Sequence, residues 1–331
     1  MNTNSVMKVG IISTGRIASK AAETLNGMTD CQAYAVGSRS IEKAQLFAKQ
    51  WKIPKYYGSY MELIQDPEVD LIYVATPHSH HYPVTKMALE AGKPCLVEKA
   101  FMANWKEASE IIELAKKNHV FLAEAIWTRY QPAVDIIKKI ITDGKIGKPQ
   151  LITATLGYEL SHKERLFNPN LCGGALLDLG VYLINFTRMV ADAEIVSIDG
   201  NCIKNDEGVD ITNAITLILD NNILANLQSS AVCVGDNIGV IAGTEGNLII
   251  DNTNNPKKLT LNSRDREFIE DIFLPPQITG YEYQFEACRR CLIEGKLQPE
   301  EMPWSEILYI MKLMDQLRKK WGVRYPMDEE S

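Results

Sequence analysis

The feature that most constrains the fold is the alternation of short apolar runs with amphipathic stretches over the first 125 residues. Apolar runs such as Leu71–Ala75 are typical of strands covered on both faces, and the stretches between them have helical spacing. Strands that alternate with helices predict βαβ units and a parallel sheet, the doubly wound α/β class. The expected strands are Val9–Ile12, Ala33–Val36, Leu71–Ala75, Cys95–Val97 and Val120–Ala123, and the expected helices are Ile17–Leu25, Ile41–Gln50, Pro83–Glu90 and Trp105–Lys117.

The pattern changes near residue 125, where segments rich in strand-forming residues replace the alternation. Asp220-Asn221-Asn222 is typical of a hairpin turn, and hairpins imply an antiparallel sheet. A chain of 331 residues also favours two domains, so we expect a Rossmann domain over 1–125 and a second, α+β domain over 126–331. In the second, the expected strands are Gln150–Leu156, Ile195–Ile203, Ile211–Leu219, Ile223–Ser230, Gly239–Ala242 and Leu248–Ile250, and the expected helices are Pro132–Thr142, Tyr281–Glu294 and Trp304–Trp321.

Charge and apolar content exclude several partners. The net charge is −7, from 42 acidic against 35 basic residues, and no run of five or more Lys or Arg occurs, which argues against nucleic acid. The N-terminus lacks the pattern of a signal peptide, and no apolar stretch approaches the roughly 20 residues of a membrane span. We therefore expect no membrane association and a cytoplasmic protein.

The seven cysteines are scattered and odd in number, which is typical of free thiols in a reducing compartment. Cys288 and Cys291 form a C-x-x-C pair. The pair lies inside a helical pattern, so we expect neighbours on one helix face rather than a redox or metal site.

A phosphate-binding turn follows the first expected strand. The dinucleotide fingerprint is G-x-G-x-x-G/A between a strand and a helix, and Ser13, Gly15 and Ala18 occupy its three positions. The helix N-terminus would offer backbone N–H groups to a pyrophosphate, so Ser13, Thr14, Gly15, Arg16 and Ile17 are candidate cofactor-binding residues. Ser13 departs from the fingerprint, and taken alone the motif is also compatible with an ordinary strand–helix loop.

The end of the second strand bears on the type of cofactor. An NAD site usually has Asp or Glu there to bind the ribose 2′-hydroxyl, whereas this chain has Ser38 and Arg39. A guanidinium suits a 2′-phosphate, which favours NADP, with NAD still possible. The alternative is that Ser40 caps the next helix and Arg39 is merely solvated.

Three further segments carry a family resemblance. They are Thr76-Pro77-His78-Ser79-His80-His81, Glu98-Lys99-Ala100, and the run from Gly173 to Tyr182, Gly-Gly-Ala-Leu-Leu-Asp-Leu-Gly-Val-Tyr. Together with the Ser13–Ala18 loop they resemble the glucose–fructose oxidoreductase and inositol dehydrogenase (Gfo/Idh/MocA) family. Within it the chain is most similar to the dihydrodiol dehydrogenase branch, which has Tyr rather than His at the position of Tyr182.

The resemblance implies a fold and a set of site residues. It implies a second domain built on a large, mostly antiparallel open sheet whose open face mediates dimers or higher homo-oligomers. The family's Glu-Lys-Pro motif places a Lys beside the nicotinamide, and Glu98 and Lys99 match it, although Ala100 replaces the Pro. The loop after the Leu71–Ala75 strand becomes part of the nicotinamide pocket, through Thr76, Pro77, His78 and His81.

The same resemblance gives Asp178 and Tyr182 acid–base roles. A Lys ammonium near a phenol favours the phenolate, so Tyr182 is the expected acid/base and Lys99 its tuning and orienting partner, in an interdomain cleft. Asp178 lies four residues before Tyr182, which puts both on one helix face, where Asp178 could anchor substrate hydroxyls or hold Lys99. Spacing alone favours the alternative, a buried Tyr182 with Asp178 as the N-cap of its helix.

Three further residues are candidates for substrate contact: Trp127, Arg129 and Arg165. An Arg and a Trp at a domain boundary form either a substrate wall or hinge packing, and the sequence does not separate the two. A metal site at His78, His80 and His81 is disfavoured because alternate residues on a strand-end loop diverge.

These features predict an NADP-dependent dehydrogenase or reductase acting on a small-molecule sugar, polyol or trans-dihydrodiol. Two alternatives are an NAD-retaining, redox-assisted glycoside-cleaving enzyme and a non-catalytic NADP sensor. The pair Ser38-Arg39 and Tyr182 argue against the first, and the set Lys99, Asp178 and Tyr182 argues against the second.

Overall fold

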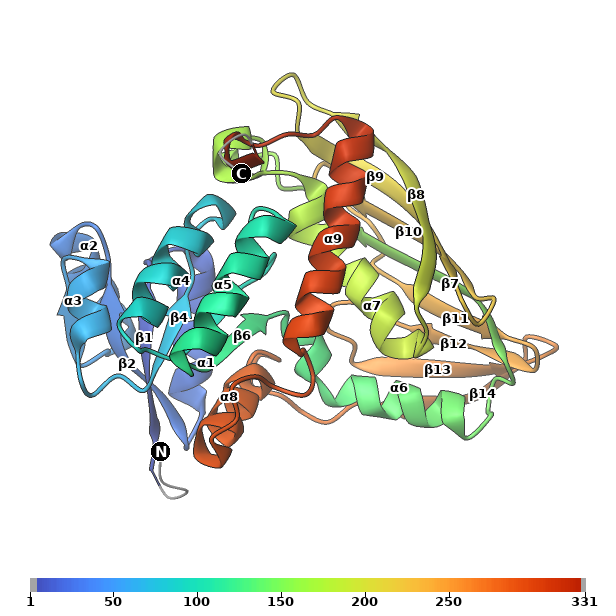
Figure 1. The fold of residues 1–331 in the computed structure, drawn as a ribbon. Helices are drawn as coiled ribbons and strands as arrows, with labels where there is room; N and C mark the ends of the chain where they lie inside the picture. The colour runs from blue at the N-terminus through green and yellow to red at the C-terminus, as the bar shows by residue number, and fades with distance from the viewer. Residues whose placement is uncertain (1–4, 329–331) are drawn as a thin grey trace. The chain divides into compact units, whose positions relative to one another are not determined.

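Residues 5–328 are described in the computed structural model, and they form two compact units (Figure 1). Of the described residues, the first unit contains 5–127 together with Gln277–Met311. The second contains Thr128–Pro276 and residues 312–328. Helix α9 (Trp304–Trp321) therefore begins in the first unit and ends in the second.

The first unit is built on a parallel six-stranded sheet of order β3-β2-β1-β4-β5-β6, the doubly wound arrangement of dinucleotide-binding domains. All neighbouring strands run parallel, and the central strands are buried along their whole length because helices cover both faces. The strands are β1 (Met7–Ile12), β2 (Cys31–Gly37), β3 (Lys55–Tyr57), β4 (Leu71–Val74), β5 (Cys95–Glu98) and β6 (Leu122–Ala125).

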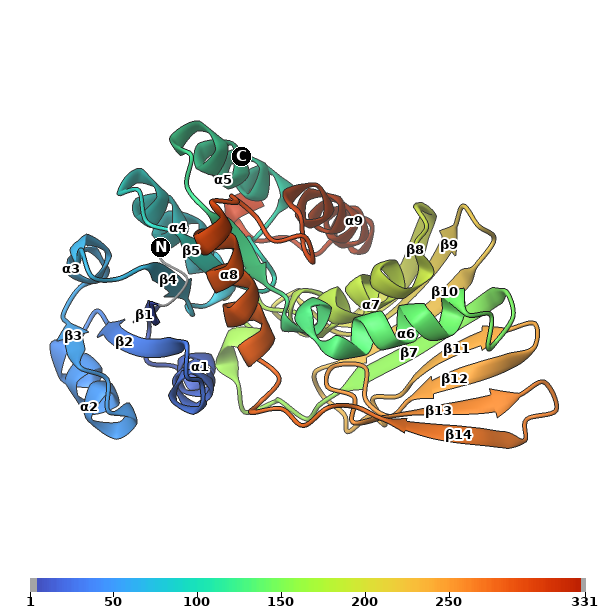
Figure 2. The ribbon, with the colours of Figure 1, turned by 90° about the horizontal axis from the view of Figure 1, so that it is seen from below.

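Helices lie in two layers on this sheet, as Figure 2 shows from below. Two pack on one face, α1 (Arg16–Gly27) and α2 (Ile41–Trp51), and three lie on the other, α3 (Tyr60–Gln65), α4 (His81–Glu90) and α5 (Trp105–Asn118). The expected strand and helix series is confirmed with shifts of a few residues at the ends. The short elements β3 and α3 were not expected, since neither is long enough to show a period.

The first unit also contains α8 (Glu282–Glu294), which the division 1–125 and 126–331 had placed in the second domain. Its buried face carries Phe285 and Cys288, which join the core formed by α1, α2 and the sheet. The Phe285 ring packs edge-on against Tyr73 of β4, with centroids 5.5 Å apart. Cys291 is buried beside Cys288, and both are free thiols, so the C-x-x-C pair lies on one helix face as expected.

The second unit is built on an eight-stranded sheet of order β14-β13-β12-β11-β7-β10-β9-β8. Every neighbouring pair is antiparallel except β7 and β10, which confirms the mostly antiparallel sheet. Strands β13 and β14 were not expected; β14 has no buried residue and no clear alternation. The strands are β7 (Pro149–Gly157), β8 (Ile195–Lys204), β9 (Asp210–Leu219), β10 (Leu224–Ser230), β11 (Gly239–Gly243), β12 (Gly246–Ile250), β13 (Lys258–Ser263) and β14 (Phe268–Phe273).

Two helices, α6 (Pro132–Thr142) and α7 (Val181–Ala191), cover one face of this sheet (Figure 2). We expected no apolar stretch as long as a membrane span. The helical stretch Pro169–Ala191 corrects this, because its length and mean hydropathy reach those of a membrane span. Its most apolar window is 89% buried inside the structure, as in a core helix. Its apolar character is thus accounted for by packing within the second unit.

Candidate active site

Ser13 makes the turn that leads from β1 into α1. Its φ is 95°, a left-handed conformation that Gly usually adopts, which is why the fingerprint has Gly here. The Ser13 N–H donates to the Gly37 carbonyl (2.9 Å), and the Ser13 hydroxyl accepts from the Gly15 N–H (3.3 Å). A side chain makes this left-handed turn energetically costly, and the Ser13 hydroxyl contributes a local hydrogen bond within it.

The N-terminus of α1 is open toward solvent. Gly15 is its N-cap and has no side chain to accept from the first N–H groups, and the first turn has no acidic residue. A Cβ built on Gly15 would meet only the Ser13 hydroxyl, at 3.7 Å. Arg16 is exposed, Thr14 and Ile17 are half-buried, and Ala18 is fully buried against the sheet. A helix terminus with uncapped N–H groups and open space before it fits a phosphate group.

Ser38 and Arg39 follow β2 at the same edge of the sheet. Ser38 is buried and its hydroxyl accepts from the Ser40 N–H (3.3 Å). Ser40 caps α2, as the alternative interpretation supposed, because its hydroxyl accepts from the Lys43 N–H (3.2 Å). Arg39 is exposed and forms no ion pair within residues 5–328. Its charge acts on His80 after β4, where it adds to burial in lowering the pKa of the imidazole.

Two histidines tie the loop after β4 to the loop after β5. His81 is fully buried; its Nδ1 lies 3.0 Å from the Ala100 carbonyl and 3.1 Å from that of Phe101. Its Nε2 lies 3.0 Å from the Thr76 carbonyl, and burial lowers the pKa of the ring to about 4. His78 Nε2 lies 3.1 Å from the Lys99 carbonyl. Both ring nitrogens of His81 face the backbone, so its side chain connects two loops rather than facing a ligand.

Glu98 and Lys99 end β5. The buried Glu98 carboxylate accepts from the Tyr73 hydroxyl on β4 and from the Lys99 N–H (3.3 Å). The Lys99–Ala100 peptide is cis. Glu98 therefore holds the backbone from which Lys99 projects. The Ser13 turn and the Thr76–Pro77 loop follow β1 and β4, the neighbouring strands where the strand order reverses, and in such sheets ligands bind at the carboxyl ends beside that point.

In the second unit, Asp178 and Tyr182 lie on one continuous helix. Asp178 falls in a π-helical turn, Leu176–Gly180, that continues into α7, where Tyr182 is the second residue. Ala175 and Gly180 are the cap residues, so Asp178 is not an N-cap. Both side chains are largely buried, with 6% and 7% exposed. Such π turns within helices occur frequently at functional sites.

Two arginines pair with polar groups of this helix. Arg165, in the short helix Glu164–Leu166, approaches the Asp178 carboxylate with Nη1 and Nη2, each 3.2 Å from Oδ1. Arg129 Nε donates to the Asn185 side-chain oxygen (2.6 Å), and Asn185 donates to the Val181 carbonyl (2.8 Å). Asn185 was not singled out from the sequence, although it stands three residues after Tyr182.

Trp127 packs inside the first unit. Its ring stacks on Tyr281, with centroids 4.2 Å apart and planes 9° from parallel, and 6% of the residue is exposed. Tyr281 was also not singled out, because nothing in the sequence links two residues so far apart along the chain. The stacking is consistent with a packing role for Trp127. Its contact with substrate stays a proposal.

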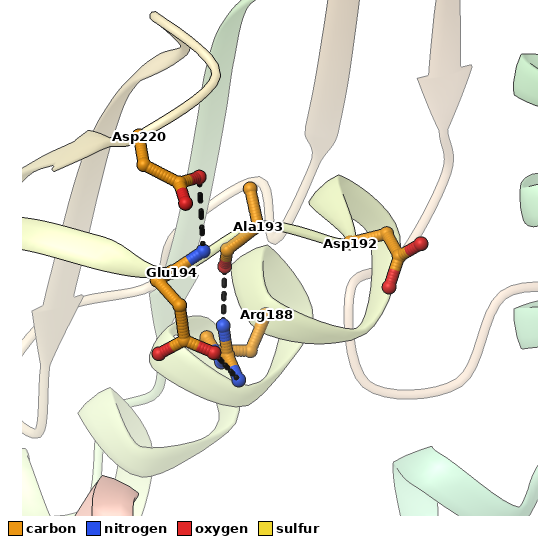
Figure 3. A pocket seen from close by; sticks show the side chains of 5 residues that line it. All are labelled: Arg188, Asp192, Ala193, Glu194 and Asp220. Atoms are coloured by element: carbon orange, nitrogen blue, oxygen red, sulfur yellow. Dashed lines mark hydrogen bonds and ion pairs between the residues drawn. The ribbon is translucent and has the colours of Figure 1, made fainter.

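A polar pocket lies at the far end of α7 (Figure 3), lined by Arg188, Asp192, Ala193, Glu194 and Asp220. Arg188 Nη2 donates to Glu194 (3.2 Å), and Arg188 Nη1 donates to the Ala193 carbonyl. The Glu194 N–H donates to Asp220 (3.2 Å). The cation is thus already paired, and none of the candidate residues lines the pocket.

The uncapped α1 terminus, the left-handed turn before it and the β1/β4 reversal define a nucleotide-binding Rossmann domain. Comparison with known proteins gives the particular family. Residues 7–125 match the Gfo/Idh/MocA oxidoreductase family with its NAD-binding Rossmann fold, and residues 134–249 match the Gfo/Idh/MocA C-terminal domain. The chain belongs to this family and is a dehydrogenase acting on CH–OH groups.

Relatives match the chain over nearly its whole length. The trans-1,2-dihydrobenzene-1,2-diol dehydrogenase of Mus musculus is 33% identical, covering 98% of this chain and 99% of that protein, and the Danio rerio enzyme is 34% identical with the same coverage. Solved structures agree in fold. They include an aldose–aldose oxidoreductase from Caulobacter crescentus complexed with glycerol (22% identity, TM-score 0.84, 95% and 97% of the two chains) and a 3-ketoreductase from Actinomadura kijaniata in complex with NADP (22%, 0.86, 95% and 98%).

Proposed function

We propose that the protein is an NADP(H)-dependent oxidoreductase that transfers a hydride between the nicotinamide and a hydroxyl or carbonyl carbon of a sugar, polyol or trans-dihydrodiol. The observation that carries the cofactor choice is Arg39, an exposed guanidinium without an ion pair within residues 5–328, in the place where an NAD site has a carboxylate. A guanidinium forms paired, charge-assisted hydrogen bonds with a phosphate. NADP in the solved 3-ketoreductase complex supports the same choice.

The proposed dinucleotide site uses backbone and side chains at the carboxyl ends of the strands. The N–H groups at the start of α1 take the pyrophosphate, from the segment Ser13, Thr14, Gly15, Arg16 and Ile17. Ser38 and Arg39 take the adenosine ribose and its 2′-phosphate. Thr76, Pro77 and His78 line the nicotinamide side with Glu98 and Lys99, while the buried His81 holds the two loops together.

The cofactor supplies the hydride acceptor, and the protein must move the proton. In the oxidation, the substrate O–H gives its proton to the Tyr182 phenolate as the C–H hydride leaves, which yields the carbonyl and a neutral Tyr182. Lys99 orients the hydroxyl and favours the phenolate through its positive charge. Asp178, held by Arg165, accepts hydrogen bonds from neighbouring substrate hydroxyls. Trp127 and Arg129 form part of the substrate wall.

The substrate class rests on the relatives, which are named for a trans-dihydrodiol, and on the aldose–aldose oxidoreductase fold neighbour. The test is calorimetry with NADP+ and NAD+, followed by absorbance at 340 nm with a panel of dihydrodiols, aldoses and polyols. We expect NADP+ to bind more tightly than NAD+ and at least one panel member to be oxidised. Absence of heat with both dinucleotides would overturn the proposal. NADP+ binding without turnover on any substrate would favour a sensor, and glycoside cleavage with retained NAD would favour the redox-assisted alternative.

We also propose that the chain forms a homodimer through the sheet face opposite α6 and α7. Leu151, Ile218 and Leu224 are 37%, 45% and 37% exposed, and Leu224 pairs with both of the others in register, so they form a continuous apolar surface. Light scattering should give a dimer for the native protein and for Leu46→Lys, a control on the exposed surface of α2, and a monomer for Leu224→Lys. A cytoplasmic location is proposed because all seven cysteines are free.

A further inference from the structure

Asp210 is a fully buried carboxylate at the start of β9 that the proposed mechanism does not use. Its Oδ2 accepts hydrogen bonds from the Leu176 N–H (2.7 Å) and from the Asn213 side-chain amide (2.9 Å). Leu176 is the first residue of the π turn that contains Asp178. A buried carboxylate thus caps the beginning of the helix that carries both Asp178 and Tyr182.

The other oxygen of Asp210 lies against the Gly173–Gly174 turn. Oδ1 has no hydrogen-bond partner within residues 5–328, and a Cβ on Gly174 would lie 2.4 Å from it. Gly174 has a φ of 129°, so its backbone conformation and its closeness to Oδ1 both exclude a side chain. The Asp178 N–H donates to the Gly174 carbonyl (3.2 Å), so this turn contacts Asp178 directly.

A second layer holds Asp210 and the turn in place. Asn213 accepts from the Ser229 hydroxyl on β10 (2.8 Å), which fixes the amide that donates to Asp210. The Tyr325 hydroxyl donates to the Gly173 carbonyl (2.6 Å), and the Arg318 guanidinium lies over the Tyr325 ring, 4.5 Å from its centroid. These contacts all lie in the second unit and converge on the segment before Asp178.

We propose that Asp210 is a positioning residue, which fixes the Leu176 N–H and the Gly173–Gly174 turn and so sets the placement of Asp178 and Tyr182. The inference rests on the proposed function in taking Asp178 and Tyr182 as the groups that act on the substrate. Removal of the carboxylate leaves the Leu176 N–H and the Asn213 amide without their acceptor, so the helix start can shift. A displacement of about 1 Å at reacting groups can lower turnover by about 100-fold.

The surroundings of Asp210 influence its protonation in opposite directions. A carboxylate at a helix N-terminus is stabilised by the positive end of the helix dipole. The ionisable groups that act on Asp210 are Arg318, which favours the carboxylate, and Tyr325 and Cys202, whose pKa values Asp210 raises. Burial raises the pKa of Asp210 to about 7, against the hydrogen bonds from Leu176 and Asn213.

The test compares Asp210→Ala, Asp210→Asn and Thr253→Ala. Asp210→Asn keeps an acceptor for the Leu176 N–H, whereas Asp210→Ala removes it. Thr253→Ala is the matched control, because Thr253 is equally buried in the same unit and its hydroxyl donates to the Thr155 carbonyl (3.1 Å), far along the chain from the helix. The measurements are kcat and KM on the best panel substrate, the Kd of NADP+, and hydrogen–deuterium exchange of peptides covering residues 174–182.

We expect Asp210→Ala to lower kcat by about 100-fold, with the Kd of NADP+ within about twofold of the native value. Exchange in 174–182 should rise selectively. Asp210→Asn should recover most of both effects, and Thr253→Ala should change neither. The proposal is overturned if Asp210→Ala leaves exchange in 174–182 unchanged, or if Thr253→Ala lowers kcat equally. If the native protein oxidises no panel substrate, the proposed function fails, and the exchange measurement alone still decides whether Asp210 holds this segment.

Discussion

Arg165 holds Asp178 through both terminal nitrogens of its guanidinium, each 3.2 Å from the same carboxylate oxygen. The Arg165 side chain is 39% exposed and that of Asp178 only 8%, so the pair reaches from solvent to a nearly buried acid. Thirteen residues separate the two along the chain, across the Gly173–Gly174 turn. The pair fixes the direction of the Asp178 carboxylate, which suits an acceptor for substrate hydroxyls.

Substitution of Arg165 tests that role. Arg165→Gln removes the charge while keeping a donor, and we expect KM for the substrate to rise by about tenfold because ground-state contacts to Asp178 weaken. Arg188→Gln is the control: Arg188 also forms an ion pair on α7, but at the other end of the helix. Steady-state kinetics of the two variants gives the comparison. Equal KM values for Arg165→Gln and the native enzyme would remove Arg165 from the substrate site.

Arg39 should determine the choice between NADP and NAD. Arg39→Ala removes the exposed guanidinium, and a charge-assisted hydrogen bond contributes about 1.5–3 kcal/mol, so the Kd of NADP+ should rise by about 10- to 100-fold. The Kd of NAD+, which lacks the 2′-phosphate, should change little. Lys43→Ala, which removes an exposed cation from α2, is the calorimetric control. A parallel loss of NAD+ and NADP+ binding in Arg39→Ala would contradict the assignment.

Tyr182→Phe should abolish most turnover while leaving cofactor binding intact. The substitution removes only the hydroxyl, and general acid–base catalysis contributes about 10²- to 10⁴-fold, so kcat should fall within that range. Tyr82→Phe provides a control, because the Tyr82 hydroxyl on α4 donates to Glu110 on α5, outside the proposed site. Near-native kcat in Tyr182→Phe would eliminate the proton-transfer role.

The sequence predicts the fold well where a local period exists. Strands such as β4 are short apolar runs, and α5 and α6 have clear helical spacing, so both kinds of element were placed within a few residues. The Ser13 turn was also recognisable, because its unusual residue stands at a fixed offset from β1. The sequence did not predict elements without a local signal, such as β3 and the exposed β14.

Contacts between distant segments were beyond the reach of the sequence. Phe285 brings α8 back to the first unit, and Asp210 meets Leu176 although 34 residues separate them. The motif predicts that His81 is a pocket residue, whereas the structure encloses its ring with three backbone carbonyls. These contacts depend on packing between segments that are distant along the chain. Residue types and local spacing therefore do not predict them.

His81 should make the protein less stable in acid. Its pKa is lowered from 6.5 to about 4 by burial, so between these values the unfolded chain binds a proton that the native ring refuses. The stabilisation is therefore present above about pH 6.5 and is lost as the pH falls toward 4, amounting to about 2–3 kcal/mol between pH 7.5 and 4.5. Urea unfolding at several pH values should show a shallower dependence for His81→Gln than for the native protein. Identical slopes would mean that the buried ring titrates with the same pKa in the folded and the unfolded protein.

Asp210 should change the stability of the protein with pH in the opposite direction to His81, over a similar range of pH. Its pKa is raised from 3.8 to about 7, so the native carboxyl keeps a proton that the unfolded chain has released, and the free energy of unfolding falls as the pH rises through this window. Asp210→Asn has no such titration. Relative to the native protein it should therefore gain about 3 kcal/mol of stability between pH 5 and pH 8, measured by urea unfolding. Thr253→Ala should instead shift the whole curve by a constant amount. A constant offset for Asp210→Asn as well would show that Asp210 is ionised in the folded protein throughout this range, with its charge compensated by Arg318 and the Leu176 N–H.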